Sequence, residues 1–147
     1  MAQGTSSSHI IFTSLRDDSH GGDTNGDGAT TGSPGSWGGI WFDRKVNDTK
    51  CRMSYCEIMF AGEGGYGNLE SPLALNAFAN PTFTNISLIS NRRNGIDVAT
   101  GNYPSDIFFN ILNIPYMIRG DLVVESSATL TIDPGVIIKL DSAPITF

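Results

Sequence analysis

The run DLVVESSATLTIDPGVIIKL, residues 121–140, decides the fold class. It contains three short apolar segments, LVV at 122–124, LTI at 130–132 and VII at 136–138, with turn-forming Ser, Asp, Pro or Gly residues between them. Segments rich in β-branched residues and bounded in this way are typical of strands. They begin six to eight residues apart, a spacing that favours consecutive faces of a solenoid whose turns stack in parallel.

The rest of the chain has the same character. A two-residue apolar period is clear at Ile86 and Leu88 and again at Ile96 and Val98. No segment keeps a 3.6-residue period over eleven residues, and 73–79 is the one stretch that could form a helical turn. The pattern predicts an all-β single domain over residues 1–147. Its further strands are expected in 10–15, 37–42, 52–60 (with a bulge), 83–90, 96–98, 107–112 and 116–118, with a turn at 62–67.

One turn keeps a different all-β architecture open. Asn94-Gly95 lies between the apolar segments ending at Ile89 and beginning at Ile96, and Asn-Gly is a strong signal for a two-residue hairpin. A hairpin there would favour a β-sandwich as the alternative fold.

The totals exclude several classes of function. The 147 residues carry a net charge of -6 with nine Lys and Arg, which argues against a nucleic-acid partner. Membrane insertion is not expected either, because no apolar run approaches eighteen residues. No export signal is visible at the start, so a cytoplasmic location stays open. Cys51 and Cys56 are expected to be free thiols, because their spacing does not favour a disulfide.

Residues 16–36 contain almost no bulky apolar side chain and are predicted to be a long insertion loop. Within it Asp23, Asn25 and Asp27 occupy positions 1, 3 and 5 of a D-x-[DN]-x-[DN]-G calcium-loop pattern, and Gly28 occupies position 6. Alternate oxygens of a tight glycine-rich loop can converge on one hard cation. The predicted ligand for Ca²⁺ at position 7 is the carbonyl of Ala29, and the upstream carboxylates Asp17 and Asp18 are expected to complete the shell.

This loop is not an EF-hand. Pro34 stands at position 12, where a bidentate glutamate would be required, and no flanking helices are predicted. The plainer interpretation is a polar loop whose Asp and Asn side chains form Asx turns. His20 adds a single imidazole, and oxygen ligands outnumber it, so calcium is favoured over zinc.

No catalytic constellation is visible, so the chain is interpreted as non-catalytic. The residues that best suit a carbohydrate-active site are Arg92, Arg93 and Asp97, together with Glu57 on an earlier strand. Trp37 and Trp41 could stack on sugars, although core packing is the simpler role for such large aromatics. A carbohydrate-binding or polysaccharide lyase- or glycosidase-like domain is therefore the alternative function.

Three stretches together resemble right-handed parallel β-helix repeat segments of large bacterial secreted or cell-surface proteins. They are GT at 4–5 with IIFTS at 10–14, GDTNGDG at 22–28 leading into WGGI at 37–40, and IPY at 114–116 with GDL at 120–122 and LTIDPGV at 130–136. The resemblance implies a right-handed parallel β-helix with an adhesive, scaffolding or polysaccharide-associated role. It also implies an extracellular or cell-surface location, within a larger exported bacterial protein.

A short solenoid with open ends is expected to self-associate into a homo-oligomer, because each end exposes unpaired backbone and apolar residues. The pattern Ser-x-x-Ile-x-Phe occurs both at 7–12 and at 142–147. If the two copies are equivalent, they favour head-to-tail stacking or a closed dimer. The other partners expected are a glycan or the surface of another protein.

Overall fold

The computed structural model describes residues 1–64, 70–142 and 144–147. All regular secondary structure in these residues is β-strand, as the sequence predicted. Within the same residues no helix has the length and apolar character needed to cross a membrane. The strands are β1 (Ala2–Gln3), β2 (Ile10–Phe12), β3 (Ile40–Phe42), β4 (Arg52–Met59), β5 (Leu73–Leu75), β6 (Thr82–Ile89), β7 (Ile96–Val98), β8 (Gly101–Tyr103), β9 (Ile107–Phe109), β10 (Tyr116–Ile118), β11 (Leu122–Val124), β12 (Leu130–Ile132), β13 (Ile138–Leu140) and β14 (Ile145–Thr146).

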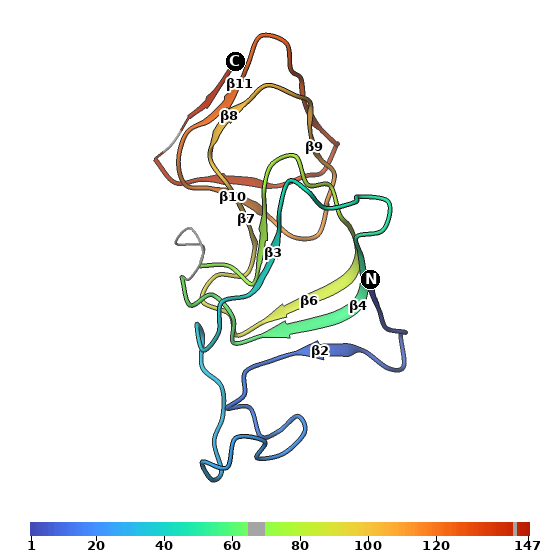
Figure 1. Cartoon of the computed structure of the whole chain (residues 1–147), viewed down its shortest axis with the longest axis vertical. Helices are drawn as coiled ribbons and strands as arrows, with labels where there is room; N and C mark the ends of the chain where they lie inside the picture. The colour runs from blue at the N-terminus through green and yellow to red at the C-terminus, as the bar shows by residue number, and fades with distance from the viewer. Residues whose placement is uncertain (65–69, 143) are drawn as a thin grey trace.

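Every pairing between these strands is parallel (Figure 1). One sheet runs in the order β13-β10-β7-β5-β3, and two smaller sheets are β14-β11-β8 and β12-β9. In the remaining sheet β4 pairs with β6 and also with both β1 and β2. A parallel neighbour cannot be reached through a tight hairpin, so each sheet gathers strands from successive passes of the chain. This arrangement fits a β-solenoid.

The register shows how regular the passes are. Tyr116 pairs with Ile96 on one side and with Ile138 on the other, so the passes there are 20 and 22 residues long. The earlier pass from Ile40 to Leu73 takes 33 residues. The regular spacing of short apolar segments in the C-terminal third therefore comes from passes of nearly constant length.

The core lies between the sheets; β5 and β7 are buried at all three positions, whereas other strands contribute alternate positions. On β10 the side chains of Tyr116 and Ile118 are buried and the residue between them is half-buried, as a two-residue period requires. The ring of Tyr116 stacks on that of Phe109 with centroids 4.5 Å apart. Its hydroxyl accepts the backbone N–H groups of Asn110 and Ile111, which satisfies a polar group inside the core, and burial raises its pKa.

Strands β4 and β6 share a bend. Tyr55 and Asn85 have positive φ values of 49° and 52°, and they lie opposite each other because the register pairs the residues on either side of them. Neither strand carries an extra residue here, so the irregularity expected within 52–60 is a paired bend and not a bulge. Asparagine tolerates a positive φ better than most residues, so it is well suited to position 85.

Most predicted strands are confirmed, and four of them, at 96–98, 116–118, 122–124 and 130–132, have the predicted bounds. The suggestion of a helical turn in 73–79 is wrong, because β5 begins there at Leu73 and its three residues are buried. The hairpin at Asn94-Gly95 is also wrong, because β6 and β7 belong to different sheets. Residues 65–67 of the turn predicted at 62–67 lie outside the described residues.

The two cysteines are free, as expected: Cys56 is buried and Cys51 is half-buried. The shared pattern at 7–12 and 142–147 does not mark equivalent places in the fold. Ile10 begins β2, which pairs with β4, whereas Ile145 begins β14, which pairs with β11. The two copies therefore lie in different sheets.

Candidate metal centre

The insertion at residues 16–36 leaves the fold after β2 and returns before β3. It contains turns and bends but no strand, as the sequence predicted, and most of its residues are exposed. In Figure 1 this blue segment extends away from the sheets at the lower end of the view.

Three carboxylates of this loop come together. Asp18, Asp23 and Asp27 each place one oxygen so that the three oxygens lie within 4.8 Å of one another. Asp18 is partly buried, and the other two are exposed. The D-x-[DN]-x-[DN]-G pattern thus contributes its first and fifth positions to the group, and one of the two upstream carboxylates joins them.

Asp23 organises the tip of the loop. Its Oδ1 accepts the backbone N–H of Gly26 at 2.7 Å and that of Asp27 at 3.2 Å, and its Oδ2 accepts the N–H of Gly28 at 3.1 Å. Gly26 and Gly28 have φ values of 72° and 86°, a region that favours glycine. The backbone therefore curls around one carboxylate, through side chain-to-backbone bonds of the kind that the plainer polar-loop interpretation expects.

Asp18 is held from the far side of the loop by Thr30. Its Oδ2 accepts the backbone N–H of Thr30 at 2.6 Å, while the hydroxyl of Thr30 lies 3.0 Å from the Arg16 carbonyl oxygen and 3.2 Å from Asp27 Oδ1. The other oxygen, Asp18 Oδ1, is buried and has no hydrogen-bond partner among the described residues. Burying a charged acceptor without a partner costs more than about 1–3 kcal/mol. A bound cation or a hydrogen-bond donor at this oxygen would remove that cost.

Of the further predicted ligands, Asn25 contacts this group. The Asn25 side-chain amide donates to Asp27 Oδ2 at 3.0 Å, so Asn25 supports a carboxylate of the group. Ala29 lies on the exposed stretch between Gly28 and Thr30. Thr30 is the residue that sequence reasoning missed, because a threonine in a polar loop carries no signal of metal binding.

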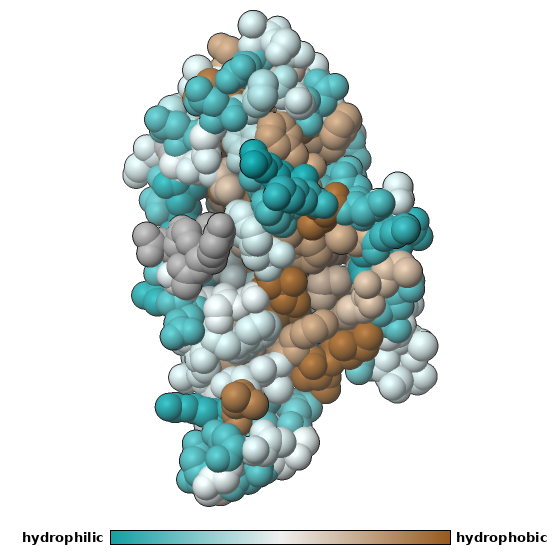
Figure 2. Space-filling view, viewed as in Figure 1, coloured by the Kyte–Doolittle hydropathy of each residue, from teal (hydrophilic) through white to brown (hydrophobic). Residues whose placement is uncertain are grey.

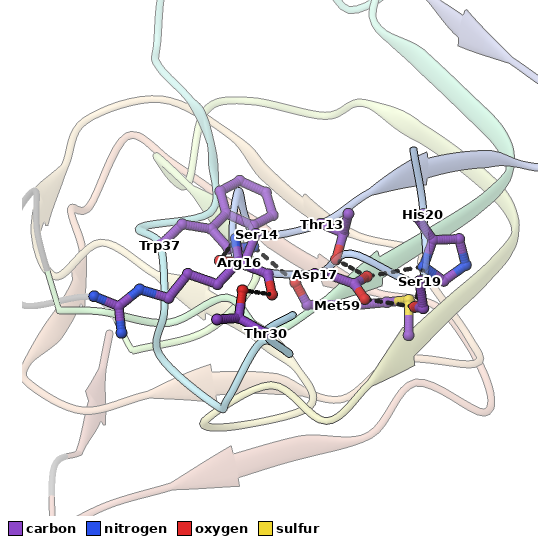
Figure 3. A network of polar contacts seen from close by, with 9 residues as sticks. All are labelled: Thr13, Ser14, Arg16, Asp17, Ser19, His20, Thr30, Trp37 and Met59. Atoms are coloured by element: carbon purple, nitrogen blue, oxygen red, sulfur yellow. Dashed lines mark hydrogen bonds and ion pairs between the residues drawn. The ribbon is translucent and has the colours of Figure 1, made fainter. Parts of the chain in front are cut away.

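Asp17, the neighbour of Asp18, points to different partners. Its buried carboxylate accepts hydrogen bonds from the hydroxyls of Thr13 and Ser19, at 2.6 and 2.5 Å, and lies 2.8 Å from His20 Nδ1 (Figure 3). Burial acts to raise the pKa of Asp17, but the bonds from Ser19, Thr13 and His20 and the charge of His20 outweigh it and hold the pKa at about 2. Asp17 thus ties the base of the loop to the end of β2.

A second charged cluster lies among the parallel strands. Asp97 on β7 is 1 % exposed and accepts the backbone N–H groups of Glu70 and Ser71. Arg119 binds both of its oxygens, through Nε at 3.1 Å and Nη2 at 3.0 Å. Glu70 also lies 3.1 Å from Arg92, 2.8 Å from Arg93 and 3.6 Å from Arg119. The cluster links strands of three successive passes.

This geometry bears on the residues considered for carbohydrate chemistry. Asp97 is buried and engaged on both oxygens, and Glu57 belongs to a different sheet, where it lies 2.7 Å from His9 Nδ1. Trp37 is half-buried against the core and donates its indole N–H to the Met59 carbonyl at 2.7 Å (Figure 3). Arg92 and Arg93 both contact Glu70, which sequence reasoning had not connected with them.

Fold and loop together define the class: an all-β protein of stacked parallel strands with a long acidic insertion. No protein-family model, no curated protein and no solved structure matches this chain.

Proposed function

We propose that the chain is a right-handed parallel β-helix module, non-catalytic, whose insertion loop binds one Ca²⁺ through Asp18, Asp23 and Asp27. The observation that carries this proposal is the buried oxygen of Asp18, which lacks a partner among the described residues and belongs to a group of three carboxylates. A divalent cation would satisfy that oxygen and neutralise the charges that the loop brings together.

The donor set favours calcium among the metals. Calcium prefers oxygen ligands at about 2.3–2.6 Å, so two oxygens on opposite sides of the ion lie about 5 Å apart. The three carboxylate oxygens lie within 4.8 Å of one another, so all three can contact one such ion. His20 is engaged with Asp17, and no cysteine is in the loop, so soft-metal ligands are lacking there. Asn25 and the Ala29 carbonyl remain proposed sources of further oxygens.

The role of the ion would be structural. It would fix the tip of a long insertion, while Asp17, with both oxygens hydrogen-bonded, holds the base. An ordered insertion on a solenoid suits an adhesive or scaffolding module of a larger exported bacterial protein. Calcium sites of extracellular modules have dissociation constants of about 0.1–1 mM, and such a site would be filled outside the cell.

Self-association is part of the same proposal. β13 is the outer strand of the largest sheet, and about half of the surface of Ile137 and of Leu140 is exposed there (51 % and 53 %). An unpaired parallel edge beside exposed apolar side chains suits pairing with another copy of the chain. Sedimentation at tens of micromolar tests this, and a clean monomer would count against it.

The calcium proposal is tested by thermal melting with excess calcium and with chelator. At a hundredfold excess over the dissociation constant the folded state should gain about 2.7 kcal/mol. Asp18→Asn and Asp27→Asn should abolish this gain. Asp121→Asn, at an exposed carboxylate outside the loop, is the matched control and should keep it. Identical midpoints with and without calcium would refute the site.

A further inference from the structure

The boundary between two sheets leaves strand edges unpaired. β6 pairs with β4 on one edge and with no other strand in the described part of the chain. β9, in the next pass, pairs with β12 alone among the strands of the described residues. Between β6 and the residues that follow β9 lies a slot of about 250 Å³, lined by 83–86 on one wall and 110–114 on the other.

The backbone of β6 offers hydrogen bonds toward this slot. The N–H of Thr82 donates to the Cys51 carbonyl, on the β4 side. In a parallel pair, alternate residues direct their backbone groups to opposite edges, so the N–H and C=O of Phe83 point to the free edge. Backbone groups at a free strand edge such as these are matched best by another extended backbone.

Three side-chain amides surround the same slot. Asn85, Asn110 and Asn113 are exposed, and none of them makes a side-chain hydrogen bond within the described residues. Asn91 shows the contrast, because its amide accepts the N–H of Ala61 and donates to the Ile58 carbonyl. Each unpartnered amide offers a donor and an acceptor side by side, the same pair that a peptide group presents.

The slot is uncharged, although the protein carries a net charge of -6: no Asp, Glu, Lys or Arg lines it. Its apolar surface comes from residues such as Ile86 and Leu112, and Figure 2 shows brown, apolar surface in the region where Figure 1 draws β2, β4 and β6. An occupant with charged side chains would lose hydration there without gaining a counter-charge.

We propose that this slot binds an uncharged, extended peptide segment of a partner protein, which adds as a strand to the free edge of β6 while Asn85, Asn110 and Asn113 hydrogen-bond its backbone. The site is separate from the acidic loop and does not rest on calcium binding.

The test uses the full chain and an array of acetylated, amidated heptapeptides made from Ser, Thr, Asn, Val, Ile and Leu. The best peptide is then measured by fluorescence anisotropy. We expect saturable binding that weakens at least about tenfold in the triple variant Asn85→Gly, Asn110→Ala, Asn113→Ala, because three backbone-directed hydrogen bonds are lost. Glycine is chosen at position 85 because φ there is 52°. N-methylation of two alternate peptide bonds in the ligand should abolish binding.

The matched control is Asn80→Ala, Asn102→Ala, which removes two amides that also lack side-chain partners but do not line the slot. It should bind as the parent does. If the triple variant does not fold, Thr84→Lys places a charge in the slot at an exposed position and should weaken binding similarly. An array without binders, or binding that survives N-methylation or the triple variant, would overturn the proposal. Saturable binding of maltohexaose that is lost in the triple variant would assign the slot to a saccharide instead.

Discussion

Replacing Arg119 by Met should destabilise the fold strongly, because it leaves the Asp97 carboxylate buried without its cation. Asp97 is 1 % exposed, and Arg119 supplies two of the four N–H groups that it accepts. Removing one partner of a buried ion pair costs about 3–5 kcal/mol. For a chain of this size each kcal/mol lowers the melting temperature by roughly 2–4 °C, so the midpoint should fall by roughly 6–20 °C.

The double variant Arg119→Met, Asp97→Asn isolates the charge. The asparagine oxygen can still accept the N–H groups of Glu70 and Ser71, so the double variant should be more stable than Arg119→Met alone. Urea unfolding followed by circular dichroism measures both, with Arg44→Met as the control at an exposed cation. The reasoning would be refuted by a loss below about 1 kcal/mol for Arg119→Met, the range of surface pairs, or by additive losses in the double variant.

Three further outcomes are expected. Ile118→Ala, at a fully buried position, should cost about 2–5 kcal/mol in urea unfolding, whereas Ile132→Ala, at a residue 44 % exposed, should cost far less. Because the folded pKa of Asp17 is about 2, below the ordinary 3.8, its contribution of up to about 2 kcal/mol is present above pH 4 and is lost as the pH falls toward 2. An acid titration of stability should show this loss in the parent and lack it in Asp17→Asn. Gly95→Ala should lower the melting temperature, because a Cβ there would lie 3.0 Å from the Pro115 carbonyl oxygen, while Gly38→Ala meets nothing within 4 Å and should be tolerated sterically.

The strands of the C-terminal third were predictable because their signals are local. Short β-branched segments alternate with Asp, Pro, Gly and Ser turns at nearly constant spacing, and the bounds of β10, β11 and β12 follow directly. The hairpin predicted at Asn94-Gly95 was wrong because its signal is also local: a turn dipeptide does not show which sheet the next strand joins. Pro115 and Met117, one pass later, approach residue 95 so closely that only a residue without a side chain fits there.

Contacts between passes were not predictable. Asp97 looks like a polar residue beside a solvated turn, but its partners Glu70 and Arg119 lie 27 and 22 residues away in the chain. Only the stacking of passes brings them together. In the loop, the sequence marked Asp17 and Asp18 as equivalent candidates, and only the fold separates them: Asp17 turns to Thr13 and Asp18 to Thr30.

That separation divides the insertion into two parts with different requirements. At the base, Asp17 is bonded to Thr13, Ser19 and His20, all of them protein groups, so this part is satisfied without metal. At the tip, the carboxylate group has a buried oxygen that no described residue satisfies. An ion bound there would add to stability without being required for the strands to stack, because the loop joins β2 to β3 and supplies no strand to any sheet. The proposed calcium site would therefore control the shape of the insertion, and the parallel sheets would persist when calcium is removed.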